Sequence, residues 1–257
     1  MNNKQQLHIE QEKIKTEIDS VALGINCQKF IIYDGIANID LYISSSIPIM
    51  FLLKESYETK GKYLWQVGII YNKKAVRKYP TLRRVGYIST GILNEMLFED
   101  VSKQSNEILA HNIESAAWVN INKIAAKSKS DVNLSEKYKI WNEIIIKQIL
   151  AYKSKIILCG NTLQYLKNDP RYINDFIKIS TPESKKYIKS AYVFKQKLFI
   201  QMIHPGKVLS RDNEKEFINS VVNYSLEWIK NLNLTTASTS YDETSVNIKN
   251  KDRDGRS

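Results

Sequence analysis

Cysteine and histidine are scarce in this chain of 257 residues, which contains two cysteines and three histidines. Cys27 and Cys159 stand far apart, and neither they nor His8, His111 and His204 show the spacing of a zinc site. We therefore expect reduced thiols, no metal ion held by the protein and no other cofactor.

Long apolar runs are also missing, since no stretch approaches the roughly eighteen residues that a transmembrane helix needs. The first residues, MNNKQQLHIEQEK, lack the basic and then apolar order of a signal peptide. These absences predict a cytoplasmic protein without a membrane partner. The chain also has no G-x-G-x-x-G or G-x-x-x-x-G-K-[ST] loop, which weakens the case for a nucleotide-binding or sugar-phosphate-binding enzyme.

Positive charge, by contrast, is abundant. The formal net charge is +11, and 43% of the residues are hydrophobic, enough for a folded core. A basic protein associates readily with polyanions, because bound phosphates release condensed counterions. A composition that is simply rich in lysine, with no functional meaning, is the alternative that the charge leaves open.

Much of this charge lies in one segment, a basic insertion that we place at residues 60–86. Between positions 54 and 84 the chain has nine Lys and Arg residues against two Glu. Aromatic residues such as Trp65 stand among them, a pattern typical of surfaces that follow a phosphate backbone and stack on bases. A solvated loop whose aromatic side chains dock on the core would have the same composition.

Four short apolar segments alternate with amphipathic helical patterns, which is typical of an α/β fold with a parallel sheet between helices. The predicted strands are Ile47–Leu53, Ala116–Val119, Lys155–Cys159 and Lys197–Ile203. We expect a three-layer α/β/α domain with a central four-stranded parallel sheet over residues 47–232, after an N-terminal helix and lead-in at 1–46. Residues 233–257 are polar and predict a disordered tail, because they offer little apolar surface to bury.

Polar residues follow each predicted strand, namely Glu55, Asn120, Asn161 and His204. The carboxyl ends of parallel strands share one edge of a sheet, where ligands bind in open α/β folds. Taken singly, each residue has an ordinary explanation as a helix cap, a turn residue or a structural histidine. Their recurrence at the same ends of successive strands indicates a shared site.

The motifs at these strand ends resemble those of the uracil-DNA glycosylase superfamily. The similar segments are Phe51-Leu52-Leu53-Lys54-Glu55-Ser56-Tyr57-Glu58, Trp118-Val119-Asn120, Ile157-Leu158-Cys159-Gly160 and His204-Pro205-Gly206. The resemblance implies a four-stranded parallel sheet between helices and a DNA glycosylase that hydrolyses the N-glycosidic bond of a flipped base. It also implies that Glu55 stands where a water-activating Asp is frequent, that Tyr57 walls the base pocket and that Asn120 reads the base.

The chemistry assigns further roles. His204 would donate a hydrogen bond to negative charge that develops on the departing base. Together with Glu55 it forms the predicted catalytic pair. The other predicted contacts are base-binding (Asn120, Tyr57, Trp65 and Asn161) and DNA-phosphate (Lys54, Lys123, Lys207, Arg83 and Arg84).

Differences from the family pattern bear on the substrate. Glu55 replaces Asp, Ser56 replaces Pro, and Gly206 replaces Ser, so we expect a changed pocket that accepts uracil or a modified pyrimidine. A hypermodified phage cytosine fits this expectation, and both DNA repair and antiviral defence are consistent with it. We expect a monofunctional, monomeric enzyme, with DNA as its partner. Two alternatives stay open: an amine nucleophile at Lys54, and a catalytically inactive nucleic-acid-binding module of the same fold.

Overall fold

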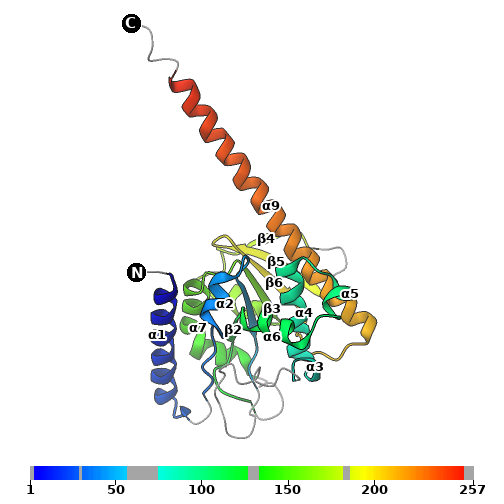
Figure 1. Cartoon of the computed structure of the whole chain (residues 1–257). Helices are drawn as coiled ribbons and strands as arrows, with labels where there is room; N and C mark the ends of the chain where they lie inside the picture. Colours follow the sequence, from blue (N-terminus) through cyan, green and yellow to red (C-terminus); the bar gives the residue numbers. More distant parts are fainter. Residues whose placement is uncertain (1–2, 29–30, 57–74, 127–132, 182–185, 252–257) are drawn as a thin grey trace.

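The computed structural model describes residues 3–28, 31–56, 75–126, 133–181 and 186–251. Helices and strands alternate along the chain as expected for an α/β protein (Figure 1). The helices are α1 (Asn3–Gly24), α2 (Ile39–Ser44), α3 (Ala75–Lys78), α4 (Pro80–Asn94), α5 (Phe98–Val101), α6 (Asn106–Glu114), α7 (Leu134–Ala151), α8 (Leu163–Lys167) and α9 (Arg211–Lys251). The strands are β1 (Ile49–Leu53), β2 (Ala117–Asn120), β3 (Ile156–Gly160), β4 (Ile177–Ile179), β5 (Ile188–Phe194) and β6 (Lys197–Met202).

One mixed sheet contains all six of these strands, in the order β2-β1-β3-β6-β5-β4. The four predicted strands correspond to β1, β2, β3 and β6, and they pair in parallel. The prediction of a four-stranded, purely parallel sheet is wrong, because β5 pairs antiparallel with β6 and β4 antiparallel with β5. The parallel part of the sheet is thereby extended on one side by an antiparallel hairpin and a short edge strand.

The sheet separates two hydrophobic clusters, because successive side chains of a strand point to opposite faces. Phe51 and Leu53 of β1 belong to a cluster with side chains of α4, α6 and α9. Met50 and Leu52 of the same strand belong to the second cluster, which includes residues of α1, α7 and α8. All five residues of β1 are buried, as expected for a central strand covered on both faces. Figure 1 shows α1 and α7 on one side of the sheet, and α4 and α9 on the other.

The described part of the basic insertion is largely helical, because α3 covers Ala75–Lys78. Residues 60–74 lie outside the described residues, but 80–86 form the start of α4, with Pro80 in its first turn. α4 is needed for the core, since Val85, Ile88 and Ile92 are fully buried. It ends at Glu95, whose left-handed backbone (φ 53°) separates α4 from α5 and α6.

Residues 31–36 run beside β2 and give it a neighbour on its outer side. Antiparallel bridges join Ile31 to Ile124 and Ile36 to Ala117. The Trp118 backbone N–H donates to the Gly35 carbonyl at 2.8 Å. This lead-in segment therefore contributes to the carboxyl end of β2, where the candidate site lies.

The final helix extends further than the sequence predicts. The backbone of α9 continues as a helix to Lys251, into the region predicted to be a disordered tail, and its distal part projects from the body (Figure 1). Its first turns pack on α4 through Phe217, Ile218, Val221 and Val222. Among the described residues, no helix is both long and apolar enough to cross a membrane.

Candidate active site

Glu55 and Asn122 come together where β1 and β2 end. The pairing of the two strands continues beyond them, because the N–H groups of Ile121 and Asn122 donate to the carbonyls of Leu53 and Lys54, each at 2.9 Å. This register places the Asn122 amide nitrogen 3.0 Å from Glu55 Oε2. The Asn122 Oδ1 atom accepts the Ile124 N–H at 3.1 Å, which fixes the orientation of the amide. Glu55 is buried, with 8% of its surface exposed, so its carboxylate is held at the strand ends and does not point into solvent.

His204 follows β6, two strands away from β1 on the same edge of the sheet. Its Nδ1 atom accepts the Gly206 backbone N–H at 3.0 Å. The neutral imidazole therefore carries its proton on Nε2, which can donate to a ligand. Burial, together with the nearby positive charge of Lys54, lowers the pKa of His204 to about 4. At neutral pH the side chain is an uncharged hydrogen-bond donor.

Gly160, the last residue of β3, allows His204 to lie close to the sheet. A Cβ atom at this position would lie 2.9 Å from Leu53 Cδ2, 3.1 Å from Pro205 Cδ and 3.3 Å from His204 Cδ2. The contacts also show that the ends of β1, β3 and β6 converge around one point. Any side chain larger than glycine here would push the histidine loop outward.

Asn120 ends β2 on the same face as Trp118, because the two residues are two positions apart in the strand. The residue is 5% exposed. Within the part of the chain that the structure describes, its side-chain amide forms no hydrogen bond. An amide with both donor and acceptor capacity thus remains available at the strand-end edge.

Asp34, Lys123 and Gln148 form a buried polar cluster beneath Asn120. The Lys123 ammonium lies 2.7 and 2.8 Å from the two Asp34 carboxylate oxygens and 2.7 Å from Gln148 Oε1. Gln148 Nε2 donates to Asp34 Oδ1 at 2.8 Å. The Asn120 backbone N–H donates to Asp34 Oδ2, which ties the cluster to the end of β2. Burial lowers the pKa of the Lys123 amine, and the Asp34 carboxylate opposes that shift.

The position of Lys123 corrects one prediction. The Lys and Asp side chains of this pair are both 0% exposed, so Lys123 is not available to a DNA phosphate. Its three acceptors lie inside the protein, where a buried charge requires partners. Lys123 instead helps to position the strand end that presents Asn120.

Arg84 also differs from the prediction of a phosphate contact. It is 1% exposed. Its guanidinium donates to Glu214 Oε1 at 2.9 Å, to the Pro205 carbonyl at 2.6 Å and to the Lys207 carbonyl. Arg83 binds the same Glu214 carboxylate through two nitrogens, at 3.0 and 3.2 Å. Arg84 of α4 thus holds the loop that follows His204, and Glu214 of α9 binds both arginines. The Lys207 side chain of that loop is exposed.

Asn161 lies in the turn between β3 and α8, at the same edge of the sheet. Its backbone is left-handed (φ 58°), a conformation that Asn adopts more easily than most residues. Its N–H donates to the Met202 carbonyl at 3.0 Å, so it links the ends of β3 and β6. This turn role accounts for an Asn at this position, and a contact with a base stays a prediction. Tyr57 and Trp65, the two predicted aromatic walls, lie outside the described residues.

The sequence prediction missed Asp34, Asn122 and Gln148. A signal for Asp34 was present, because it is the only charged residue of the apolar segment 31–36. A charged residue in such a segment requires a buried partner. Gln148 gave no comparable signal, since an uncharged polar residue in a helix is ordinary.

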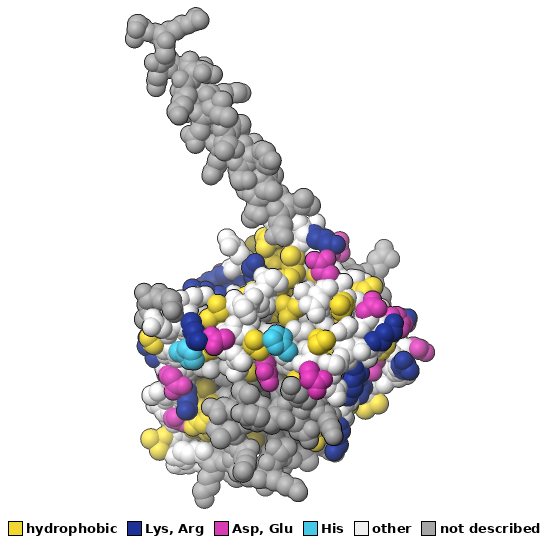
Figure 2. Space-filling model, in the orientation of Figure 1, with side chains coloured by type: hydrophobic (Ala, Val, Ile, Leu, Met, Phe, Trp, Pro, Cys, Tyr) yellow, Lys and Arg dark blue, Asp and Glu magenta, His cyan; other side chains and the backbone are white. Residues whose placement is uncertain are grey.

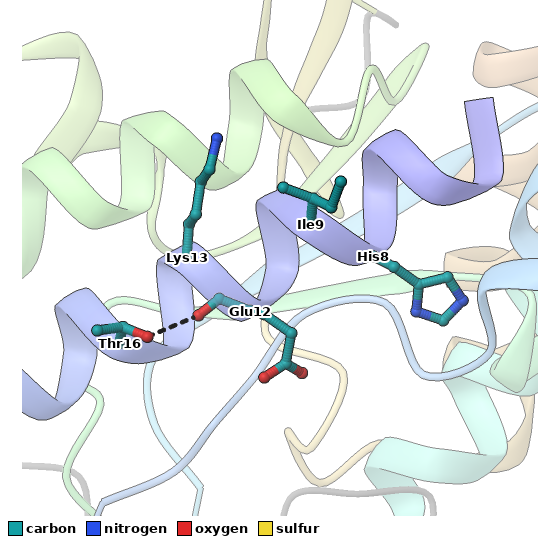
Figure 3. A pocket seen from close by; sticks show the side chains of 5 residues that line it. All are labelled: His8, Ile9, Glu12, Lys13 and Thr16. Atoms are coloured by element: carbon teal, nitrogen blue, oxygen red, sulfur yellow. Dashed lines mark hydrogen bonds between the residues drawn. The ribbon is translucent and has the colours of Figure 1, made fainter. Parts of the chain in front are cut away.

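A shallow depression on the outer face of α1 is unrelated to this site. It is lined by His8, Ile9, Glu12, Lys13 and Thr16, all from one helix, and Figure 3 shows their side chains spread along it. The bond between Thr16 Oγ1 and the Glu12 carbonyl, 3.1 Å long, is internal to the helix. Among the described residues, no three His, Cys, Asp or Glu side chains are grouped so that they could hold a metal ion.

Comparison of the whole chain with protein-family models and with curated proteins gives no match. The fold and the geometry of the strand-end edge are therefore the basis of the functional argument.

Proposed function

We propose that this protein is a monofunctional DNA glycosylase of the uracil-DNA glycosylase type, which hydrolyses the N-glycosidic bond of a flipped uracil or modified pyrimidine. The observation that carries the proposal is that Glu55, Asn120 and His204 lie at one edge of the sheet, at the ends of the parallel strands β1, β2 and β6. These parallel strands, with β3 between β1 and β6, would correspond to the sheet of that family, and β5 and β4 would be additions to it.

Each side chain suits one part of the reaction. Base excision requires the nucleotide to leave the stack and enter a pocket. The side-chain amide of Asn120 would read the edge of the flipped base with its donor and acceptor. His204 Nε2–H would donate to a base carbonyl as negative charge develops there. Its lowered pKa keeps the imidazole neutral at pH 7, and the Gly206 N–H bond to Nδ1 leaves the proton on Nε2, where it can be donated.

Glu55 would stabilise positive charge on the sugar and orient the attacking water. The hydrogen bond from Asn122 fixes one carboxylate oxygen and so sets the direction in which the carboxylate faces the water. Lys54, which lies close enough to lower the pKa of His204, adds positive charge next to the departing base. Lys54, Arg83 and Lys207 remain predicted phosphate contacts, whereas Lys123 and Arg84 are buried.

Val208 would assist base flipping. Val208 lies in the loop that follows His204, directly after Lys207, and is 93% exposed. Arg84 holds this loop through the Pro205 carbonyl. Apolar side chains that enter a base step unstack it and help to kink the duplex. An exposed valine beside the histidine is suitably placed for that role. On this proposal the protein acts as a monomer on DNA in the cytoplasm.

The test is excision from a panel of oligonucleotides, single-stranded and duplex, that contain uracil, hydroxymethylcytosine or glucosylated hydroxymethylcytosine. Abasic sites are detected by alkaline cleavage. The proposal predicts product with at least one substrate, and a loss of about 100-fold or more in turnover for Glu55→Gln and for His204→Ala. Matched controls are Glu99→Gln and His111→Ala, which replace the same residue types outside the strand-end edge and should leave turnover unchanged.

Folded protein that binds DNA without forming any abasic product would contradict the proposal and favour an inactive nucleic-acid-binding module. The modified-cytosine arms separate the two biological settings. Product from uracil alone supports repair, and product from glucosylated cytosine supports defence against phage DNA.

A further inference from the structure

Four lysines lie at the amino ends of the strands, opposite the candidate active site. Lys153 and Lys155 belong to the connection between α7 and β3, Lys195 belongs to the turn between β5 and β6, and Lys197 is the first residue of β6. The parallel pairing of Ile156 with Leu198 places Lys155 beside Lys197. We call these residues the amino-end lysine cluster. A five-residue strand separates it from the strand-end edge by about 16 Å.

The described part of the chain offers the cluster little compensating negative charge. Among the described residues, none of the four lysines forms an ion pair. The sequence contains no Asp or Glu between positions 144 and 168, nor between 184 and 211. α2 packs on this region, because Tyr42 of α2 is hydrogen-bonded to Ser154. Asp40 of the same helix is already paired with Lys4 at 2.6 Å.

The positive charge of Lys153 also acts on Lys197. Lys197 is half-buried and donates to the Ser154 carbonyl at 3.1 Å, so its ammonium is held beside Lys153 and Lys155. Burial and the charge of Lys153 both lower the pKa of Lys197. Such repulsion is unfavourable for the isolated protein and is relieved when an anion binds.

The backbone gives an independent indication. Lys153 (φ 54°), Lys195 (φ 46°) and Gln196 (φ 59°) adopt left-handed conformations. Lys153 follows the end of α7, and Lys195 and Gln196 form the two-residue turn between β5 and β6. Glycine or asparagine is preferred at left-handed positions in both settings. Lys153 and Lys195 therefore carry a conformational cost that glycine or asparagine would avoid. Backbone costs of this kind are characteristic of functional positions.

We propose that the amino-end lysine cluster binds the phosphate backbone of a nucleic acid, as a second contact surface separate from the strand-end edge. Lysine is suited to this partner, because its flexible ammonium follows closely spaced phosphates without base specificity. The exposed residues of the two connections are Lys153, Lys155, Lys195 and Gln196, so no apolar side chain is offered to a lipid surface. On the face drawn in Figure 2, Lys and Arg side chains stand among Asp and Glu side chains.

The test compares two triple variants of the full chain that remove the same charge. Lys153→Gln, Lys155→Gln and Lys195→Gln remove exposed members of the cluster. The matched control, Lys13→Gln, Lys139→Gln and Lys147→Gln, removes lysines that are paired with Glu10, Glu136 and Glu17. Binding to a labelled 30-base-pair duplex without modified bases is measured between 25 and 200 mM KCl, about the range over which counterion release is strong.

The cluster variant should reduce the slope of log Kobs against log[KCl] by about 2 to 3, since each lost phosphate contact contributes about 0.9. The control should change that slope by less than about 0.5. Equal effects of the two variants would refute the proposal, because net charge would then explain binding. It would also be refuted if the cluster variant lost binding to phosphatidylserine vesicles and kept its affinity for DNA. The probe contains no substrate base, so a failed glycosylase proposal leaves this result interpretable.

A second measurement tests the backbone argument. Lys195→Asn should raise the Tm, because Asn adopts the left-handed conformation more easily, and should weaken DNA binding at the same time. A lower Tm would contradict the assigned conformational cost. Unchanged DNA affinity would contradict a contact at this position.

Discussion

Replacing Lys123 with methionine should be one of the most destabilising single substitutions in this protein. The change removes the ammonium that contacts both Asp34 oxygens and Gln148 Oε1 at 2.7 to 2.8 Å. Asp34 would keep two donors, the Asn120 N–H and Gln148 Nε2, but it would be a fully buried carboxylate without a counter-charge. Breaking a buried pair from one side costs about 3–5 kcal/mol.

This cost is a large part of the total stability of a typical domain, which is about 5–15 kcal/mol. A loss of about 4 kcal/mol corresponds to a fall in Tm of roughly 8–16 °C for a chain of this size. Urea unfolding followed by circular dichroism measures the free energy, and a thermal scan measures the Tm. The matched control is Lys147→Met, which breaks an exposed pair with Glu17 at 2.7 Å and should cost less than about 1 kcal/mol.

The double variant Asp34→Asn with Lys123→Met tests the reason for the loss. The introduced asparagine side chain would be neutral, could still accept the Asn120 N–H and could donate to Gln148 Oε1. Because no buried charge remains, the double variant should be more stable than Lys123→Met alone by about 1–3 kcal/mol. The electrostatic argument would be refuted if Lys123→Met cost no more than Lys147→Met, or if the double variant were the less stable of the two.

Four further outcomes are expected. The folded pKa of His204, about 4, lies below its unfolded value of 6.5. The unfolded state therefore binds more protons than the folded state between these pH values. As the pH drops from 6.5 to 4, the free energy of unfolding of the wild type should fall by up to about 3 kcal/mol relative to that of His204→Gln. The prediction would be contradicted if urea denaturation gave the two proteins the same dependence of stability on pH. Gly160→Ala should displace His204 and lower the kcat of excision at least about tenfold, and it should cost about 1–3 kcal/mol in stability. An unchanged kcat would show that the loop after β6 tolerates the Cβ atom. Asn122→Ala should lower kcat more than it raises KM, because it removes the hydrogen bond that orients the Glu55 carboxylate, and a pure KM effect would argue against that role. Val208→Ser should slow excision from duplex DNA and spare single-stranded DNA, and equal slowing of both would argue against base flipping as its role.

The strand cores illustrate what local sequence can predict. The run Ile49-Met50-Phe51-Leu52-Leu53 is apolar throughout, and it is buried throughout as β1. Its partners β2, β3 and β6 were predicted within two residues at each end for the same reason, since a strand covered on both faces must be continuously apolar. The shared edge at their carboxyl ends follows from the parallel pairing.

The antiparallel strands illustrate where local patterns fail. β5, Ile188–Phe194, is only partly buried: Ile188, Ala191 and Phe194 are buried, and the residues between them, Lys189 included, are more exposed. Its turn to β6 is formed by Lys195 and Gln196, which lack the Asn-Gly signal of a hairpin. The segment before β5 contains Pro170 and Pro182, which are typical of loops and give no signal for the short strand β4.

Charged residues show the same limit at the candidate site. Glu55, Asn120 and His204 could be assigned to strand ends because each directly follows an apolar run. For Lys123 and Arg84, composition predicted exposure, and the fold placed them beside Asp34 and Glu214.

The sequence by itself thus determined the α/β class, the four parallel strands and the polar residues that end them, because these depend on neighbours along the chain. Only the tertiary structure decided which charges are buried and which positive surface stays open. Asp34 and Lys123 are 89 residues apart, and Arg84 and Glu214 are 130 apart, so neither pairing has a local signal. Local hydrophobicity dictates where a strand runs, but the partner of a buried charge depends on which distant segment the fold brings beside it.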